Sequence, residues 1–287
     1  MTASSSADDE PIVIACALDD RYVPLAGVAL YSLATCHRLA NPIHAHLFAS
    51  GVAAERRQML TYRLREVGVQ SHWHDVSPHR LTSDPVLAPY VMLTPHYHRL
   101  LMPYLLPRFV KRALYIDVDV MVLADVHELW KTSLDHYVTA ACLDYLEKVG
   151  TGISNHEALG LQADDSYFNS GVMLIDMVAW RAARVSERVL TCTQRNRPYL
   201  DALGKFHQYE QYGLNVVLYR RWKELHIKWN YGSEKPFCDA AIVHFNGHGK
   251  PWSKTCKLEF KDLFFSFLER SGWMREYQAA FGIIRPE

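Results

Sequence analysis

Two acidic residues interrupt one of the most apolar stretches of the chain. The segment Arg112–Leu123 reads Arg-Ala-Leu-Tyr-Ile-Asp-Val-Asp-Val-Met-Val-Leu, and eight of its last ten residues are apolar. Its β-branched side chains favour a strand that is buried on both faces. A buried carboxylate without a partner costs several kcal/mol, a large part of a domain's net stability. Asp117 and Asp119 therefore require a compensating cation.

The spacing of the two carboxylates indicates which cation this is. Side chains two apart on a strand point the same way, and ligands of parallel sheets bind beyond the carboxyl ends of the strands. Two carboxylates there suit a hard divalent ion, which shares its oxygen ligands with substrate phosphates. The functional interpretation is thus a metal that holds a nucleotide diphosphate. The alternative is a strand that ends at Ile116 and leaves both carboxylates in a solvated turn, and the spacing alone does not decide between them.

A second polar cluster closes another apolar stretch near the end of the chain. His244 ends the run Ala240–Val243, and Gly247, Gly249 and Lys250 follow it. An imidazole that binds a metal, open backbone N–H groups and a point charge suit a diphosphate. The glycines would serve an ordinary loop equally well. The combination with the two aspartates favours the diphosphate interpretation.

Further polar residues stand at the ends of expected strands and helices. Arg99 is a charge in an apolar run, which either pairs with one of the two aspartates or helps to hold the diphosphate. Asp144 ends an expected strand and is a candidate donor-binding residue, and Asn169 is a candidate hydrogen-bonding partner of the substrate. Glu210 lies near the start of a helical stretch, where the helix dipole alone would explain an acidic residue.

The pattern of strands and helices predicts an α/β fold with a mostly parallel sheet flanked by helices. The segment 145–166 is polar and weakly periodic, and we interpret it as a mobile loop on the acceptor side. The segment Lys254–Glu287 is amphipathic and basic, so it either docks on the domain or lies on an anionic membrane, and docking is favoured. Strands are expected at 12–17, 44–49, 69–76, 138–143 and 172–175, and helices at 25–39, 53–67 and 178–195.

Composition limits the class of protein. The 287 residues contain 31 Lys+Arg and 31 Asp+Glu, and this balance argues against extended nucleic-acid binding. The six cysteines are scattered without a Cys-x-x-Cys pair, which is typical of inert thiols in a reducing compartment. There is no signal-peptide pattern and no long apolar span, so a cytoplasmic protein is expected. Residues 1–11 are predicted to be disordered, 12–252 to form the catalytic domain and 253–287 a helical tail.

Three His-x-His pairs are a further candidate for metal binding. They have no neighbouring cysteine or acidic partner at structural-zinc spacing, so surface or hydrogen-bonded histidines are the favoured interpretation. The pairs are His44/His46, His72/His74 and His96/His98.

Taken together, these motifs resemble the retaining glycosyltransferases of family 8, which have the GT-A fold. The likeness extends from Ile12 to Trp252, and its motifs occur in the family's order. They are Ala-x-Asp-Asp-x-Tyr from Ala17, Tyr-x-Arg-Leu from Tyr97, Leu-Tyr-Ile-Asp-Val-Asp from Leu114, Phe-Asn-x-Gly from Phe168, Glu-Gln-Tyr-Gly-Leu-Asn from Glu210, and His-x-x-Gly-x-x-Lys-Pro-Trp from His244.

The resemblance implies a role for each motif. Asp117, Asp119 and His244 would bind a divalent ion, with manganese typical and magnesium the alternative, and Gly247 and Lys250 would contact the diphosphate. The uridine would be held by Ala17, Asp19, Asp20 and Tyr22, with Arg21 standing where members often have Asn. Arg99 would lie beside the donor, while Phe168, Asn169 and Gly171 line the sugar pocket. Gln211 would lie closest to the reacting carbon, next to Tyr212, which replaces an acid of the family motif.

The implied activity is the metal-dependent transfer of a hexose, galactose or glucose, from a UDP-sugar to a saccharide or glycolipid acceptor. Synthesis of lipopolysaccharide or another cell-surface glycan is the expected setting, in the cytoplasm or at the inner face of the membrane, with contact through the tail. Two alternatives remain. A non-catalytic glycan-binding relative would have lost its metal site, against which Asp117, Asp119, His244 and Lys250 argue, while Tyr212 leaves this alternative open. A sugar nucleotidyltransferase would need a Gly-rich basic loop after the first strand, where this chain has Leu-Asp-Asp-Arg.

Overall fold

The structure is a computed structural model that describes residues 10–38, 41–77, 95–202 and 209–282. The fold is α/β, as predicted, with a mixed and mostly parallel sheet flanked by helices. Its seven strands run in the order β3-β2-β1-β4-β7-β6-β8. The predicted disorder of the N-terminus concerns residues that lie almost entirely outside the described ranges. Contacts divide the chain into two compact units: unit 1 comprises Met1–Ser77, Ile116–Thr132 and Lys228–Glu287, and unit 2 comprises Pro78–Tyr115 and Ser133–Ile227.

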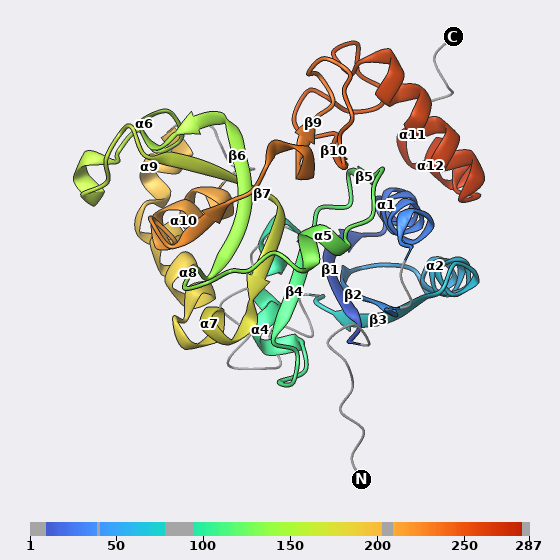
Figure 1. Cartoon of the computed structure of the whole chain (residues 1–287), viewed down its shortest axis with the longest axis horizontal. Coiled ribbons are helices and arrows are strands. Elements are labelled where there is room, and N and C mark those ends of the chain that lie inside the picture. Colours follow the sequence, from blue (N-terminus) through green and yellow to red (C-terminus); the bar gives the residue numbers. More distant parts are fainter. Residues whose placement is uncertain (1–9, 39–40, 78–94, 203–208, 283–287) are drawn as a thin grey trace. The chain divides into compact units, whose positions relative to one another are not determined.

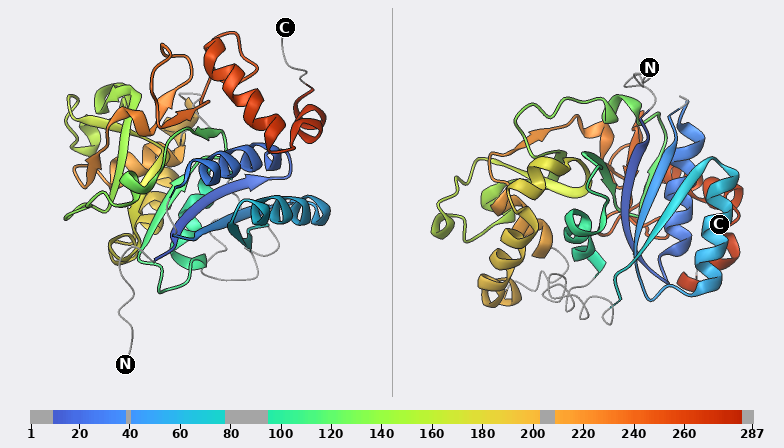
Figure 2. Two further views of the ribbon diagram at one scale, coloured as in Figure 1. Left: turned by 45° about the vertical axis from the view of Figure 1, so that its right-hand side comes forward. Right: turned by 90° about the horizontal axis from the view of Figure 1, so that it is seen from below.

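Unit 1 is built on three parallel strands with helices on one face. β1 pairs with β2 from Ile12↔Ile43 onward, and β2 pairs with β3 from Ile43↔Val69 onward. Helices α1 and α2 cover the same face of these strands (Figure 2). The elements are β1 (Ile12–Asp19), α1 (Val23–Cys36), β2 (Ile43–Ser50), α2 (Ala54–Glu66), β3 (Val69–Asp75), β5 (Val120–Val122), α5 (His127–Trp130), β9 (Tyr231–Gly232), β10 (Ile242–His244), α11 (Leu258–Arg270) and α12 (Met274–Phe281).

A second, three-stranded sheet in unit 1 has the order β5-β10-β9. β10 runs antiparallel to β5, with Val120 opposite His244, and parallel to β9, with Gly232 opposite His244. The buried hydroxyl of Ser32 in α1 accepts a hydrogen bond of 2.9 Å from the N–H of Val122. Helix α1 therefore fixes the position of β5, and through β5 that of β10.

The C-terminal helices α11 and α12 dock on unit 1, which confirms the favoured interpretation of the tail. Phe260, Phe264, Phe265 and Leu268 of α11 are buried. Both helices contact α1, and they lie beside it in Figure 1. The apolar face of α11 is consequently covered by protein. In the described part of the chain, no helix is long and apolar enough to cross a membrane. The predicted boundary between a catalytic domain and a tail at residue 252 stays a prediction.

Unit 2 carries the other half of the main sheet. β6 pairs with β7 in the antiparallel sense and with β8 in the parallel sense. Helices α8 and α10 pack against each other beside β7 (Figure 1). The elements, of which β4 and η5 cross the unit boundary, are η2 (Pro95–Leu101), α4 (Met102–Leu105), β4 (Arg112–Ile116), β6 (Thr139–Lys148), α6 (Val149–Gly152), η3 (Glu157–Leu159), β7 (Ser166–Asp176), α7 (Met177–Ala182), α8 (Val185–Arg195), α9 (Arg197–Ala202), α10 (Tyr209–Val217), β8 (Trp222–Glu224) and η5 (Ile227–Trp229).

Two sequence predictions in unit 2 are wrong. The segment 145–166 is not structureless, because β6 continues to Lys148 and is followed by α6 and η3. The single helix expected over 178–195 is two helices, because Arg184 adopts a left-handed backbone conformation with φ of 49°. The first of them, α7, starts at the side chain of Asp176, which accepts hydrogen bonds of 2.8 Å from two backbone N–H groups.

Candidate active site

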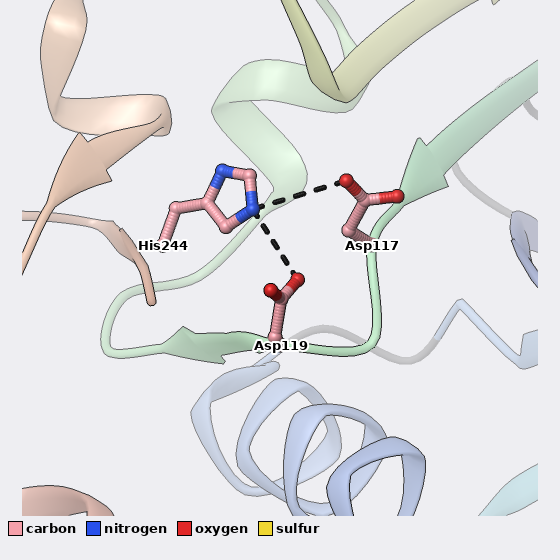
Figure 3. Close-up of side chains that lie close together, drawn as sticks. All are labelled: Asp117, Asp119 and His244. Carbon is pink, nitrogen blue, oxygen red and sulfur yellow. Dashed lines mark ion pairs between the residues drawn. The ribbon is translucent and has the colours of Figure 1, made fainter. Parts of the chain in front are cut away.

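The Asp-x-Asp pair lies in a turn and not inside a strand. β4 ends at Ile116 and β5 begins at Val120, so the uninterrupted strand predicted from the sequence is wrong. The carboxylates are nevertheless mostly buried: the side chains of Asp117 and Asp119 are 24% and 15% exposed. Both point toward His244 (Figure 3). The turn therefore brings the two carboxylates together, although the prediction of this arrangement assumed a continuous strand.

Asp117, Asp119 and His244 form a compact group of potential metal ligands. The Nε2 atom of His244 lies 3.3 Å from Oδ1 of Asp119 and 3.8 Å from Oδ2 of Asp117. The antiparallel pairing of β5 with β10 produces this arrangement, because it places Val120 opposite His244. The N–H of Phe245 also donates a 2.9 Å hydrogen bond to the backbone oxygen of Asp119. Within the described ranges, this is the one group of three or more such side chains close enough to share an ion.

The buried side chain of Asn230 orients the imidazole of His244. Nδ1 of His244 lies 2.9 Å from Oδ1 of Asn230. An amide oxygen only accepts hydrogen bonds, so Nδ1 carries the proton and donates it. In the neutral imidazole Nε2 is then the nitrogen without a proton, and Nε2 is the atom that faces the two carboxylates. This is the tautomer that a metal ligand requires.

These residues fit a divalent metal ion. Neighbouring ligands of a six-coordinate ion of this size are roughly 3 Å apart, and the distances from Nε2 to the two carboxylates are 3.3 and 3.8 Å. Carboxylate oxygens and a neutral imidazole are both established ligand types for such ions. Only small movements would bring the three atoms to coordination distance.

Lys250 forms an ion pair with Asp119 in the structure. Burial by itself would raise the pKa of the Asp119 carboxyl, but the positive charge of Lys250 outweighs burial and lowers it. Burial would likewise lower the pKa of Lys250, and Asp119 outweighs this effect and raises it. The site therefore carries an ionised carboxylate and a charged ammonium side by side.

The loop between β10 and Lys250 depends on its glycines in different ways. Gly247 has a φ of +47°, which disfavours a residue with a side chain. At Gly249 an added Cβ would come within 2.5 Å of Oγ of Ser233, so the backbone passes too close for a side chain. Gly249 thus has the structural role that an ordinary loop would give it. At Gly247 an added Cβ would have no atom within 4 Å, so the backbone there is accessible.

The polar turn after β1 lines a cavity of about 450 Å³. Asp19 accepts a hydrogen bond of 3.1 Å from the N–H of Tyr22 and so shapes the start of α1. Asp20 accepts one of 3.0 Å from the N–H of Ala53 and pairs with Arg56, which ties the turn to α2. The cavity is lined by Asp19, Asp20, Arg21, Ser50, Gly51, Arg56 and Ala280.

A network of buried amide and carboxylate groups forms a second cluster in unit 2. Oδ2 of Asp144 accepts hydrogen bonds from Asn169 at 2.8 Å and from Nε2 of Gln211 at 3.2 Å. Oε1 of Gln211 accepts from the backbone N–H of Ser170 at 2.9 Å and from its hydroxyl at 3.2 Å. All of these side chains are at least nine-tenths buried. The structure thus brings three predicted donor-site residues together and fixes the amide of Gln211 in one orientation.

Arg99 and Glu210 form a buried ion pair in the same unit. Nη2 of Arg99 lies 3.7 Å from Oε1 of Glu210, and their side chains are 1% and 4% exposed. Arg99 also donates to the backbone oxygen of Ser170, and its guanidinium lies 4.4 Å from the ring centre of Tyr115. The helix-dipole interpretation of Glu210 is therefore incomplete, because the residue also balances a buried arginine.

The family described as "Glycosyl transferase family 8" matches residues 13–256. The chain belongs to this family. General stress protein A of Bacillus subtilis (strain 168) is 26% identical over 282 residues, which cover 91% of this chain and 94% of that protein. Lipopolysaccharide 1,2-glucosyltransferase of Escherichia coli (strain K12) is 28% identical over 195 residues, 62% of this chain and 54% of that protein. Probable galacturonosyltransferase-like 3 of Arabidopsis thaliana is 29% identical, and this chain spans half of its length.

Solved structures establish the fold of this family 8 chain. The galactosyltransferase LgtC, solved with donor and acceptor sugar analogues, superimposes with a TM-score of 0.73 at 22% identity, covering 94% of this chain and all of that one. The apo structure of the bifunctional glycosyltransferase WbbM gives a TM-score of 0.74 at 18% identity, covering 97% of this chain and 53% of that one. The predicted GT-A fold is thereby confirmed.

Asn215 of the family 8 chain is a residue whose role sequence reasoning missed. Its amide exchanges hydrogen bonds with the backbone N–H and oxygen of Phe168, at 2.8 and 2.9 Å, and also donates to the oxygen of Gln211 at 2.9 Å. It therefore clamps α10 onto β7. Gly213 allows α10 to approach α8, since an added Cβ would lie 2.8 Å from side-chain atoms there. The position of Asn215 in the altered motif was the available signal.

Tyr212, at the position where the resemblance implies an acid, forms its hydrogen bond outside the amide network. Its hydroxyl donates a hydrogen bond of 3.0 Å to Oδ1 of Asn155, in the segment between α6 and η3. Burial raises the pKa of Tyr212 to about 12, so its hydroxyl stays neutral. The substitution therefore adds a packing contact in this chain and leaves Gln211 and its partners in place.

One histidine of each pair on β2 and β3 is hydrogen-bonded, in line with the interpretation favoured from the sequence. Nδ1 of His46 lies 2.9 Å from Nε2 of His74, and the ring of His72 stacks on His46 with 4.6 Å between centroids. Burial, followed by the neighbouring histidines, lowers the pKa of His46 to about 3 and that of His74 to about 4. They are therefore neutral near pH 7. The side chain of His96 lies outside the described residues.

Proposed function

We propose that this family 8 glycosyltransferase transfers a hexose, galactose or glucose, from a UDP-sugar to a saccharide or glycolipid acceptor, with a divalent metal, manganese or magnesium. The observation that carries the proposal is the Asp117–Asp119–His244 group with Lys250 beside it. This combination of two carboxylates, an imidazole and an ammonium suits a metal-bound diphosphate. The E. coli relative named as a glucosyltransferase supports a hexose and a cell-surface glycan.

The resemblance supports an assignment for each part of the donor. We assign the uridine to the turn of Ala17, Asp19 and Tyr22, and the diphosphate to Gly247 and Lys250. We assign the sugar to the amide network of Asp144, Asn169 and Gln211, with Arg99 and Glu210 forming an ion pair in the same unit as this network. The cavity beside Asp19 and the rigid hydrogen bonds of the network support this assignment.

Electrostatic stabilisation of the leaving group is the main catalytic effect that we assign. Cleavage of the bond between the anomeric carbon and the diphosphate leaves additional negative charge on UDP. When bound, the metal supplies Lewis-acid stabilisation of that charge. Lys250, held at the site by its ion pair with Asp119, adds a second positive charge.

Retention of configuration is assigned to a same-face mechanism. A double displacement would need a free carboxylate below the sugar ring. In unit 2, Asp144 already accepts hydrogen bonds from Asn169 and Gln211, and Glu210 pairs with Arg99. These carboxylates are therefore engaged in holding the network together. In the proposed mechanism the departing phosphate accepts the acceptor's proton, and Gln211 stabilises the positive charge that develops on the sugar.

Release of UDP from a panel of UDP-sugars tests the function. We expect hydrolysis of one UDP-hexose with manganese and none with a chelator. Asp119→Asn should abolish it, whereas Asp239→Asn, which changes an exposed carboxylate of the same unit, should have no effect. Binding of UDP without any turnover, even with saccharide acceptors, would favour the non-catalytic relative. Turnover of a nucleoside triphosphate with a sugar phosphate would instead identify a nucleotidyltransferase.

A further inference from the structure

The C-terminal helix α12 reaches the turn to which we assign the uridine. Its last residue, Phe281, makes an edge-to-face contact with Tyr22, with 5.9 Å between ring centroids. The same ring stacks on Trp252 at 4.9 Å, and the guanidinium of Arg21 lies 5.0 Å from its centre. One aromatic side chain therefore joins the early motif, which contains Tyr22, to the late motif, which ends at Trp252.

Phe281 is held by a continuous set of buried aromatic rings. Tyr277, one turn earlier in α12, is fully buried and lies 5.1 Å from Phe281 and 6.0 Å from Trp252. Tyr277 in turn contacts Phe264 of α11 at 5.6 Å. Aromatic pairs at these distances are favourable and directional. The packing of α12 against α11 therefore fixes the position of Phe281.

The start of α12 is fixed on α1, the helix that begins directly after Tyr22. Gly27 of α1 leaves room for Trp273, since an added Cβ would lie 2.0 Å from the indole nitrogen. On its other side the indole lies 4.3 Å from the guanidinium of Arg63 in α2, and Arg63 also pairs with Glu276. Helix α12 is consequently anchored to the same two helices that frame the turn.

Helix α12 also lines the cavity next to this turn. Ala280, the neighbour of Phe281, contributes to the wall of the 450 Å³ cavity together with Asp19 and Arg21. A cavity of this size is in the range of small-molecule sites. The aromatic contact and the cavity wall are independent observations, and both place the end of α12 beside the proposed base-binding turn.

We propose that Phe281 is a positioning residue for the nucleobase of the donor. It holds the ring of Tyr22 in the orientation in which Tyr22 stacks on the base, so that the C-terminal helix is part of the nucleotide site. This inference rests on the proposed function, because it takes UDP as the ligand. It predicts that the contribution of Phe281 is specific to the base and absent for the diphosphate.

Calorimetric titration with manganese present tests this proposal with two probes, UDP and inorganic pyrophosphate. Phe281→Ala should weaken UDP binding about two- to tenfold, the range expected for losing an aromatic contact. Phe281→Tyr should restore it, and pyrophosphate binding should not change in either variant. Phe281→Leu is a second variant that keeps an apolar side chain at the helix end. Phe237→Ala, which removes a 51% exposed ring packed on Phe260 of α11, should leave UDP binding unchanged.

The outcomes separate this inference from the function on which it rests. If the wild-type protein binds no UDP, the proposed function itself is wrong and this inference falls with it. If the wild-type protein binds UDP, and both Phe281→Ala and Phe281→Leu bind it as tightly as the wild type, only the role of Phe281 is wrong. Tighter binding by Phe281→Ala would mean that the ring covers the base site, which also overturns the proposal. Equal weakening of UDP and pyrophosphate would show a general structural effect and would overturn it too.

Discussion

Replacing Asn230 with leucine is expected to weaken manganese binding by about 10- to 100-fold, the usual effect of removing an outer partner of a metal-bound histidine. Asn230 and His244 are 6% and 3% exposed, and 2.9 Å separates Oδ1 from Nδ1. Without this acceptor, two states are available to the imidazole. Either the N–H at Nδ1 stays buried and unpaired, at a cost of about 1 to 3 kcal/mol, or the proton moves to Nε2, where it blocks the metal.

The magnitude follows if the proton moves to Nε2, because metal binding must then return it to Nδ1 and leave that N–H buried and unpaired. A factor of ten in affinity corresponds to about 1.4 kcal/mol, so a penalty of about 1 to 3 kcal/mol gives roughly the same 10- to 100-fold range. Asn230→Asp keeps an acceptor at the same distance and should retain most of the affinity. The variant thus separates the loss of the acceptor from a change in packing.

Two measurements check this prediction. Titration of manganese with detection of the free ion gives the affinity of the wild-type protein and both variants without requiring turnover. Two-dimensional NMR of ¹⁵N-labelled histidine reports which ring nitrogen of His244 carries the proton, with His244→Gln used to assign its signals. Wild-type affinity in Asn230→Leu, together with an unchanged Nδ1–H tautomer, would refute the argument. Thermal unfolding of each variant controls for loss of structure.

Three further predictions concern other parts of the chain. Lys250→Met should weaken UDP binding about 10- to 100-fold. It should not weaken the binding of manganese alone, because Asp119 loses a competing cation. Calorimetry that shows unchanged UDP binding would contradict the role of Lys250. Asn215→Ala should lower the free energy of unfolding by roughly 2 to 4 kcal/mol, since buried backbone groups lose their partners; a loss well below 1 kcal/mol in urea denaturation would show that the clamp is dispensable. The pKa of His46 is lowered to about 3, so between pH 6.5 and 4.5 the unfolded chain binds a proton that the folded state does not, and stability falls as the pH decreases. From pH 7 to 4.5, the free energy of unfolding of the wild type should therefore fall by roughly 2 kcal/mol more than that of His46→Gln. Equal losses in urea denaturation would be inconsistent with this account.

The sequence predicted the components of the metal group but not its geometry. Asp117, Asp119 and His244 were recognisable because charged and imidazole side chains stood beside apolar runs. The expected mechanism of convergence, one continuous strand, was wrong, since β4 ends at Ile116. Convergence comes instead from the pairing of β5 with β10, segments that are more than a hundred residues apart. Periodicity is a local property and cannot reveal such a pairing.

The supporting residues were missed for the same physical reason. Asn230, Asn215 and Phe281 each act on a side chain or backbone group from a different element. Asn215 stood in a recognised motif that did not reveal its partner, and nothing in the local sequence distinguishes Asn230 or Phe281 from other asparagine and phenylalanine residues. Elements with strong apolar patterns were predicted well, as β1 (Ile12–Asp19) and β2 (Ile43–Ser50) show. The break at Arg184 was not predicted, because a single left-handed residue leaves the helical periodicity on both sides intact.

The most direct test of the central claim is the binding of manganese with and without UDP, measured through the free ion. The account predicts that UDP strengthens manganese binding to the wild-type protein and that manganese strengthens UDP binding by the same factor, because both ligands share the Asp117–Asp119–His244 group. Asp119→Asn should remove this coupling. Manganese binding that is unaffected by UDP, or coupling that survives in Asp119→Asn, would contradict the assignment of this group as the centre of the donor site.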